Sequence, residues 1–200
     1  MLTLGLDSTS AYCSVSLVDD ARVLGHISEK INRGHAERLA PMVDEVLTEA
    51  SVDASAIERI AVCTGPGSFT GLRVALAYAK GFALPRSLPV IGIDALAVTA
   101  QSIRFSKNDH LVGVMRDIRR GQVFYATYSH GEAIEPPRAM TLEEAETDAE
   151  TLQAAIYEST HIDTRILAWL AMDADPADYP AVPLYSRAPD AKLPGGKSPK

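Results

Sequence analysis

The sequence predicts an α/β fold, because its apolar residues first alternate at strand period and then recur at helical period. Leucines alternate with small or polar residues at the start, and two further apolar stretches follow short turn sequences. This alternation predicts a three-stranded meander with strands near residues 2–7, 11–18 and 22–29. Beyond residue 34, segments with helical spacing of apolar residues alternate with short apolar runs that are typical of buried strands. A meander followed by alternating helices and strands is typical of the α/β class.

The segments after the meander predict three helices and two strands in alternation. Pro41 falls early in the first helix, near residues 35–50, and removes a backbone donor, so we expect a local bend or a late helix start. Six apolar residues of this helix share spacings of three, four and seven, which marks one face: Leu39, Met42, Val43, Val46, Leu47 and Ala50. The later predicted elements are a strand at 60–63, a helix at 69–84, a strand at 90–93 and a helix at 94–104.

A domain boundary is predicted within residues 106–109, where a polar turn separates two patterned regions. Residues 1–105 then form an N-terminal lobe and residues 106–186 form a smaller α/β lobe. Residues 187–200, with three prolines and a glycine pair, are predicted to be a flexible tail.

Local signals within the smaller lobe predict two strands and a capped helix. The strands, at 111–115 and 122–128, enclose a turn that contains Gly121. Thr141 followed three residues later by Glu144 predicts the start of a helix with a solvated acidic face.

Composition and charge exclude several classes of protein. The chain has 200 residues, of which 46% are hydrophobic and 22% charged, so it is not disordered throughout. Net charge is −7, with 9 basic and 11 acidic residues up to position 104 and 10 and 15 beyond it. Neither half is therefore a basic nucleic-acid platform.

The two cysteines and the apolar runs bear on where the protein resides. Cys13 and Cys63 each lie in an apolar run without a CxxC spacing, so we expect reduced, buried thiols. No uninterrupted apolar run reaches 18 residues, and the start has no basic region before its apolar stretch. We expect a cytoplasmic protein that does not associate with membranes.

Two turns that follow strands could contact a phosphate. Acid and hydroxyl groups follow the first strand, although an ordinary Asx turn explains them equally well. A glycine-rich loop precedes the helix at 69–84, whose first amides could hold an anion. We therefore name six candidate nucleotide or phosphate contacts: Asp7, Ser8, Thr9, Gly65, Gly67 and Ser68.

The sequence contains neither a metal-binding histidine motif nor the motif of a hydrolytic nucleophile. His35 opens a predicted helix, but no second histidine stands at position 39 and the other histidines are isolated. The loop Gly65–Ser68 lacks the spacing of a nucleophile elbow. We expect no catalytic residue set and no metal site.

Small residues recur every fourth position in the helix at 69–84, namely Gly71, Ala75, Ala79 and Ala83. Such a ridge allows close approach of another helix, which makes it a candidate contact with a partner subunit. The alternative is that the ridge faces the protein's own sheet and that a different helical face meets the partner.

Four motifs together closely resemble the TsaB family over about residues 1–130. They are Leu6–Thr9 after the first strand, Gly34–Met42 opening one helix, Gly65–Arg73 (Gly-Pro-Gly-Ser-Phe-Thr-Gly-Leu-Arg) opening the next, and Asp117–Phe124 in the second lobe. The resemblance implies an actin-like ATPase (ASKHA, RNase H-like) fold with one complete N-terminal lobe and a shortened C-terminal lobe. It also implies a dimerisation subunit in the synthesis of N6-threonylcarbamoyladenosine at position 37 of tRNAs that read ANN codons.

The resemblance further implies partners and an interface. The transfer is expected from the paralogue TsaD, with TsaE as a further partner, a homodimer when the chain is alone, and tRNA contacted only through the complex. No cofactor of its own is expected, although ATP or ADP could lie at the junction with TsaD. The interface is predicted on the helices at 35–50 and 68–84, through His35, Leu39, Met42, Val43, Val46, Phe69, Gly71, Leu72, Ala75 and Ala79. The alternative function is an independent small ATPase or kinase, or a peptidase of the glycoprotease type.

Overall fold

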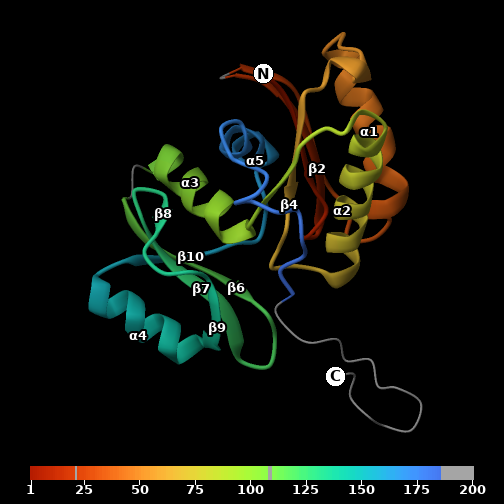
Figure 1. Ribbon diagram of the computed structural model, residues 1–200. Helices are drawn as coiled ribbons and strands as arrows, with labels where there is room; N and C mark the ends of the chain where they lie inside the picture. Colours follow the sequence, from red (N-terminus) through yellow and green to blue (C-terminus); the bar gives the residue numbers. More distant parts are fainter. Residues whose placement is uncertain (21, 108–109, 186–200) are drawn as a thin grey trace, which may run out of the picture.

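Two five-stranded β-sheets organise the computed structural model, which describes residues 1–20, 22–107 and 110–185 (Figure 1). The first sheet has the order β3-β2-β1-β4-β5. Strands β1 to β3 are antiparallel neighbours, whereas β4 and β5 run parallel to β1. The bounds of these strands are β1 Leu2–Asp7, β2 Tyr12–Asp19, β3 Arg22–Lys30, β4 Arg59–Cys63 and β5 Val90–Ile93. The predicted α/β class is confirmed.

Helices cover both faces of the first sheet (Figure 1). Helices α1 (His35–Glu49) and α2 (Phe69–Ala83) pack on one face, and α5 (Thr164–Ala171) packs on the other. Strand β1 is therefore buried from Thr3 to Asp7, polar residues included. Leu4 and Leu6 are completely buried, and each such side chain stabilises the fold by about 1.5 to 3 kcal/mol.

Helix α1 begins at His35, so of the two alternatives expected from Pro41 the late start is wrong, while the local bend stays a prediction. Gly34 precedes the helix in the left-handed conformation, with φ of 87°, which a glycine adopts without strain. The buried apolar stripe of α1 offsets the backbone hydrogen bond that Pro41 cannot donate. The predicted strands and helices of the first lobe are otherwise found within three residues of their expected bounds.

The second sheet has the order β10-β6-β7-β8, with β9 also paired to β7. The turn between β6 and β7 has positive φ at Arg119, Arg120 and Gly121, which confirms the predicted hairpin. Thr141 and Glu144 form a complete capping box at the start of α4, as predicted. The elements are α3 Ala95–Lys107, β6 Leu111–Asp117, β7 Gln122–Ser129, β8 Glu132–Ala133, β9 Arg138–Thr141, α4 Leu142–Leu152 and β10 Ala155–Glu158, and short 3-10 turns occur at Ala54–Ala56 and Leu84–Arg86.

After the second sheet the chain returns to the first one (Figure 1). Helix α5 contacts β1, β2 and β4, and Pro180 forms an antiparallel bridge with Ile91 of β5. The division into lobes between residues 105 and 106 stays a prediction, and the predicted tail at 187–200 lies outside the described residues. Among the described residues, no helix is both long and apolar enough to cross a membrane.

Candidate functional site

An apolar groove of about 510 Å³ lies between α1 and α2 on their outer side. Phe69 at the start of α2 is 45% exposed beside it, although it is a large aromatic residue. Burial raises the pKa of Tyr78 to about 12, so its hydroxyl is neutral at every physiological pH. The groove is lined by Ala36, Leu39, Phe69, Thr70, Arg73, Val74, Ala77 and Tyr78.

Most of the predicted interface residues lie beneath this surface and not on it. Six of them line no part of the groove and are buried in the chain's own core: Met42, Val43, Val46, Leu72, Ala75 and Ala79. Their assignment to the contact surface is wrong, because spacings of three and four marked the faces that pack on the sheet. The alternative is confirmed for the small-residue ridge of α2, because Ala75, Ala79 and Ala83 pack in the core against the protein's own sheet.

The remaining four predicted interface residues line openings on this side of the molecule. Leu39 and Phe69 line the groove, and His35 and Gly71 line a neighbouring cleft. Six groove residues were not predicted from the sequence: Ala36 on α1, and Thr70, Arg73, Val74, Ala77 and Tyr78 on α2.

The glycines of the motif at Gly65–Arg73 allow α2 to contact the turn after β1. A Cβ atom on Gly71 would lie 1.8 Å from the carbonyl oxygen of Ser8, and one on Gly67 would lie 2.5 Å from that of Thr9. The Ser8 hydroxyl donates to the Gly71 carbonyl over 2.7 Å, and the Ser68 amide donates to the Thr9 carbonyl over 2.8 Å. Ser68 also caps α2, as predicted. The motif therefore fixes the position of α2 on the sheet.

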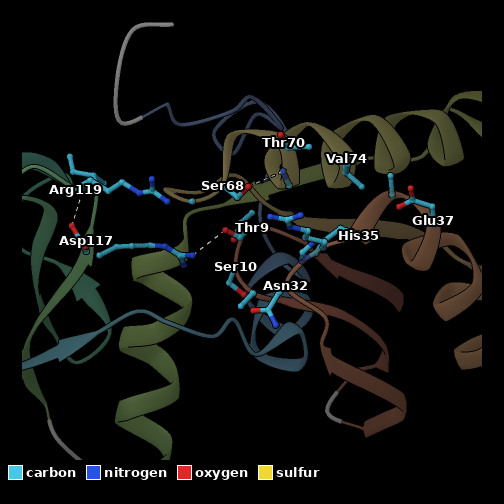
Figure 2. Close-up of a pocket in the computed structure, with 18 residues that line it drawn as sticks. Thr9, Ser10, Asn32, His35, Glu37, Ser68, Thr70, Val74, Asp117 and Arg119 are labelled. Atoms are coloured by element: carbon cyan, nitrogen blue, oxygen red, sulfur yellow. Dashed lines mark hydrogen bonds between the residues drawn. The ribbon is translucent and has the colours of Figure 1, made fainter. Parts of the chain in front are cut away.

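A polar cleft of about 740 Å³ adjoins the groove and separates the turn after β1 from the β6–β7 hairpin (Figure 2). Asp117 and Arg119 lie on the side of the second sheet, facing Thr9 and Ser68 (Figure 2). Arg116 of β6 reaches across to the turn after β1 and donates from Nη2 to the Thr9 carbonyl over 3.1 Å. The cleft and the groove share three lining residues, Ala36, Thr70 and Val74.

Only half of the candidate phosphate contacts reach this cleft. Thr9, Gly67 and Ser68 line it, whereas Asp7, Ser8 and Gly65 do not. Ser8 is completely buried because its hydroxyl and carbonyl face α2.

Asp7 is buried at the end of β1 in a polar but protein-filled environment. Its Oδ1 accepts hydrogen bonds from the Thr9 amide at 3.0 Å and the Thr9 hydroxyl at 2.7 Å. Its Oδ2 has no hydrogen-bond partner among the described residues. Burial raises the pKa of Asp7, and the hydrogen bonds from Thr9 and the charge of Arg116 offset only part of that rise.

Neither cysteine is disulfide-bonded, and both are buried, as predicted. Burial raises the pKa of Cys13 to about 12 and also raises that of Cys63, so both thiols stay protonated and unreactive. Within residues 1–20, 22–107 and 110–185, no group of three or more histidine, cysteine or acidic side chains is arranged to hold a metal ion.

Comparisons with known proteins agree with this architecture. The sequence model of the family described as TsaD, tRNA N6-adenosine threonylcarbamoyltransferase, matches residues 17–167. The tRNA threonylcarbamoyladenosine biosynthesis protein TsaB of Escherichia coli is 36% identical over 66% of this chain and 57% of its own length. TsaB of Haemophilus influenzae is 35% identical over 62% and 52%. The match thus spans a little over half the length of these relatives.

Other relatives match over nearly their whole length. The uncharacterized protein Rv3421c of Mycobacterium tuberculosis is 32% identical over 94% of this chain and 93% of its own. A crystal structure of a Pseudomonas aeruginosa protein similar to the peptidase YeaZ superposes with a TM-score of 0.79 at 28% identity, covering 93% of this chain and 99% of that one. A structure of YeaZ from Pseudomonas aeruginosa gives 0.77 at 29% identity, over 92% and 99%. The chain therefore belongs to the tRNA N6-adenosine threonylcarbamoyltransferase family, and within it to the TsaB group.

Proposed function

We propose that the chain is a non-catalytic subunit that supports a TsaD-type enzyme in the threonylcarbamoylation of adenosine 37 of tRNAs reading ANN codons. Its TsaB relatives are named for threonylcarbamoyladenosine biosynthesis, and the enzyme family itself is the one whose model matches. In this role the chain binds the catalytic subunit through the α1–α2 groove and also self-associates through the same face when alone.

The groove is the observation that carries this proposal. Phe69 is nearly half exposed at the edge of an apolar depression between two helices, and contiguous exposed apolar surface of this kind marks interaction sites. Completing the burial of Phe69 alone would contribute roughly 1 kcal/mol, since full burial of such a side chain is worth about 1.5 to 3 kcal/mol. The buried ridge and stripe beneath support the groove as a rigid base.

Because the cleft and the groove share lining residues, a nucleotide bound in the cleft would lie beside the subunit that docks in the groove. Arg33, Arg116 and Arg119 line the cleft, and both α1 and α2 begin at it. Cationic side chains and helix N-termini favour phosphate groups. ATP or ADP would therefore be held between this chain and the TsaD-type subunit, and not by Asp7 or Ser8.

The remaining partners follow from the family and from charge. TsaE joins the assembled pair, and tRNA is contacted through the complex, because a chain of net charge −7 lacks the cationic excess that drives RNA binding. The assembly works in the cytoplasm.

The alternative, an independent ATPase or kinase or a glycoprotease-like peptidase, is less well supported. An ATPase of this fold would use the turn after β1, but Asp7 and Ser8 are buried against the chain's own atoms. A thiol peptidase would need a reactive thiolate, whereas both thiols are protonated and buried. A metallopeptidase would need a ligand set, and the described residues contain no group of three or more histidine, cysteine or acidic side chains arranged to hold a metal.

Reconstitution tests the proposal. The purified chain should form no threonylcarbamoyladenosine alone, and its addition should raise the output of the purified TsaD-type subunit from the same organism. Turnover by the chain alone that is lost in Asp7→Ala would contradict the non-catalytic role. Ala139→Glu, an exposed substitution on β9, serves as the control for a groove substitution, Ala77→Glu.

A further inference from the structure

The last described segment of the chain, residues 179–185, is here called the C-terminal strap. It follows α5 and crosses the edge of the first sheet, where the Gly92 amide donates to the Tyr179 carbonyl over 2.9 Å. Farther along, the Leu184 amide donates to the Thr64 carbonyl over 2.8 Å. Ala181 between them belongs to the same buried cluster as α1 and α2. The strap is thus held by the main chain at both ends.

The fit between the strap and β5 is close. A Cβ atom on Gly92 would lie 2.5 Å from the Pro180 carbonyl oxygen and 2.6 Å from Cγ2 of Thr64. Such a contact admits only a glycine, so the path of the strap toward α2 is fixed by packing.

The strap ends in an aromatic cluster at the start of α2. The rings of Tyr185 and Phe69 are 5.2 Å apart at an interplanar angle of 36°. Arg73 contacts both aromatic residues. Its Cζ lies 3.9 Å from the Phe69 ring centre, and its Nε donates a hydrogen bond to the Tyr185 hydroxyl over 3.3 Å. Tyr185 remains 38% exposed. We call Phe69, Arg73 and Tyr185 the aromatic rim.

The aromatic rim continues the docking groove without a break. Phe69 and Arg73 line the groove and also contact Tyr185. Tyrosine and arginine held in a fixed position are residue types that dominate binding energy at protein interfaces. Resting on the proposed function, we infer that the C-terminal strap is part of the docking surface and that Tyr185 is one of its anchors, with a second copy of this chain as the occupant.

Charge favours a second copy. Helix α1 carries four acidic residues and one arginine, Arg38, which pairs with Glu45 and with Glu29 of β3. Its net charge is therefore negative, with Glu37, Asp44 and Glu49 in excess, whereas α2 carries Arg73 and Lys80 and no acidic residue. A two-fold axis that sets α1 of one copy against α2 of the other places opposite charges together, twice. Tyr185 of each copy then lies at the edge of the helix contact.

Self-association of the full chain tests this inference. Sedimentation equilibrium should show a dimer whose dissociation constant rises at least tenfold in Tyr185→Ala, with an unchanged melting temperature. Tyr179→Ala is the matched control, because Tyr179 is a 46% exposed tyrosine of the same strap whose two main-chain hydrogen bonds, from its amide to Asp175 and from the Gly92 amide to its carbonyl, are kept by alanine. That control should dimerise like the parent protein.

The outcomes separate the inference from the proposed function. If Ala77→Glu breaks the dimer and Tyr185→Ala leaves it intact, the strap is not part of the interface, while groove docking stands. If neither substitution changes association, or if the parent chain is monomeric, the inference falls, and binding of the TsaD-type subunit then decides the proposed function separately. Should Tyr185→Ala fold poorly, hydroxyl-radical labelling of the parent decides: protection of Tyr185 on dimerisation supports the inference, and unchanged labelling overturns it.

Discussion

Replacement of Gly71 by alanine should lower the free energy of unfolding strongly, although it adds only one methyl group. The substitution Gly71→Ala adds one methyl group, whose carbon would lie 1.8 Å from the Ser8 carbonyl oxygen and 2.9 Å from its carbon. Both are backbone atoms next to buried β1, so no flexible side chain can move aside. Overpacking in a well-packed core costs about 1 to 3 kcal/mol, and we expect at least the upper end here.

The helix offers its own control. Gly81 lies in the same α2, is exposed, and has nothing within 4 Å of an added Cβ atom. Gly81→Ala should therefore stabilise the protein by about 0.5 to 1 kcal/mol through helix propensity. Urea unfolding measures both changes in free energy. A Gly71→Ala protein within about 0.5 kcal/mol of the parent, which is the usual range for neutral surface substitutions, would refute the close contact between α2 and the turn after β1.

Three further predictions concern pH, capping and thiol chemistry. Because the pKa of Asp7 is raised in the folded state, the unfolding free energy of the parent should fall relative to that of Asp7→Asn as pH rises from about 4 to 7. Urea titrations at several pH values measure this difference, and a difference that does not change with pH would contradict the raised pKa. Thr141→Ala should cost about 1 kcal/mol by removing the capping box of α4, whereas Thr147→Ala on the exposed face should change little in the same thermal melts. Iodoacetamide should leave Cys13 and Cys63 unmodified in the native protein and label both in urea, as mass spectrometry would show; rapid native labelling would mean that a thiol is accessible.

Local patterns predicted the elements well but could not say what each face meets. Alternation and helical period located the strands of the first sheet and the helices α1 and α2, because burial of one face imposes those periods. The same period made Ala75 and Ala79 a candidate partner surface. Period tells which residues share a face, and only the three-dimensional packing shows that this face meets the chain's own sheet.

Local sequence patterns did not predict where the chain returns to the first sheet. Helix α5 covers the first sheet although it follows the second one, and the strap places Tyr185 beside Phe69, more than a hundred positions earlier. Gly5 and Gly92 mark these contacts, since a Cβ on either would lie 2.5 Å from the carbonyl oxygen of Thr164 or Pro180. A glycine within a strand indicates that another segment packs closely there, but the sequence does not show which segment it is.

Calorimetric titration of the chain into the purified TsaD-type subunit from the same organism measures whether the α1–α2 groove binds that subunit. We expect saturable binding with a negative heat-capacity change from burial of the apolar groove, lost in Ala77→Glu and retained in Ala139→Glu. Binding that is absent, or that is equal in the two variants, would contradict this expectation.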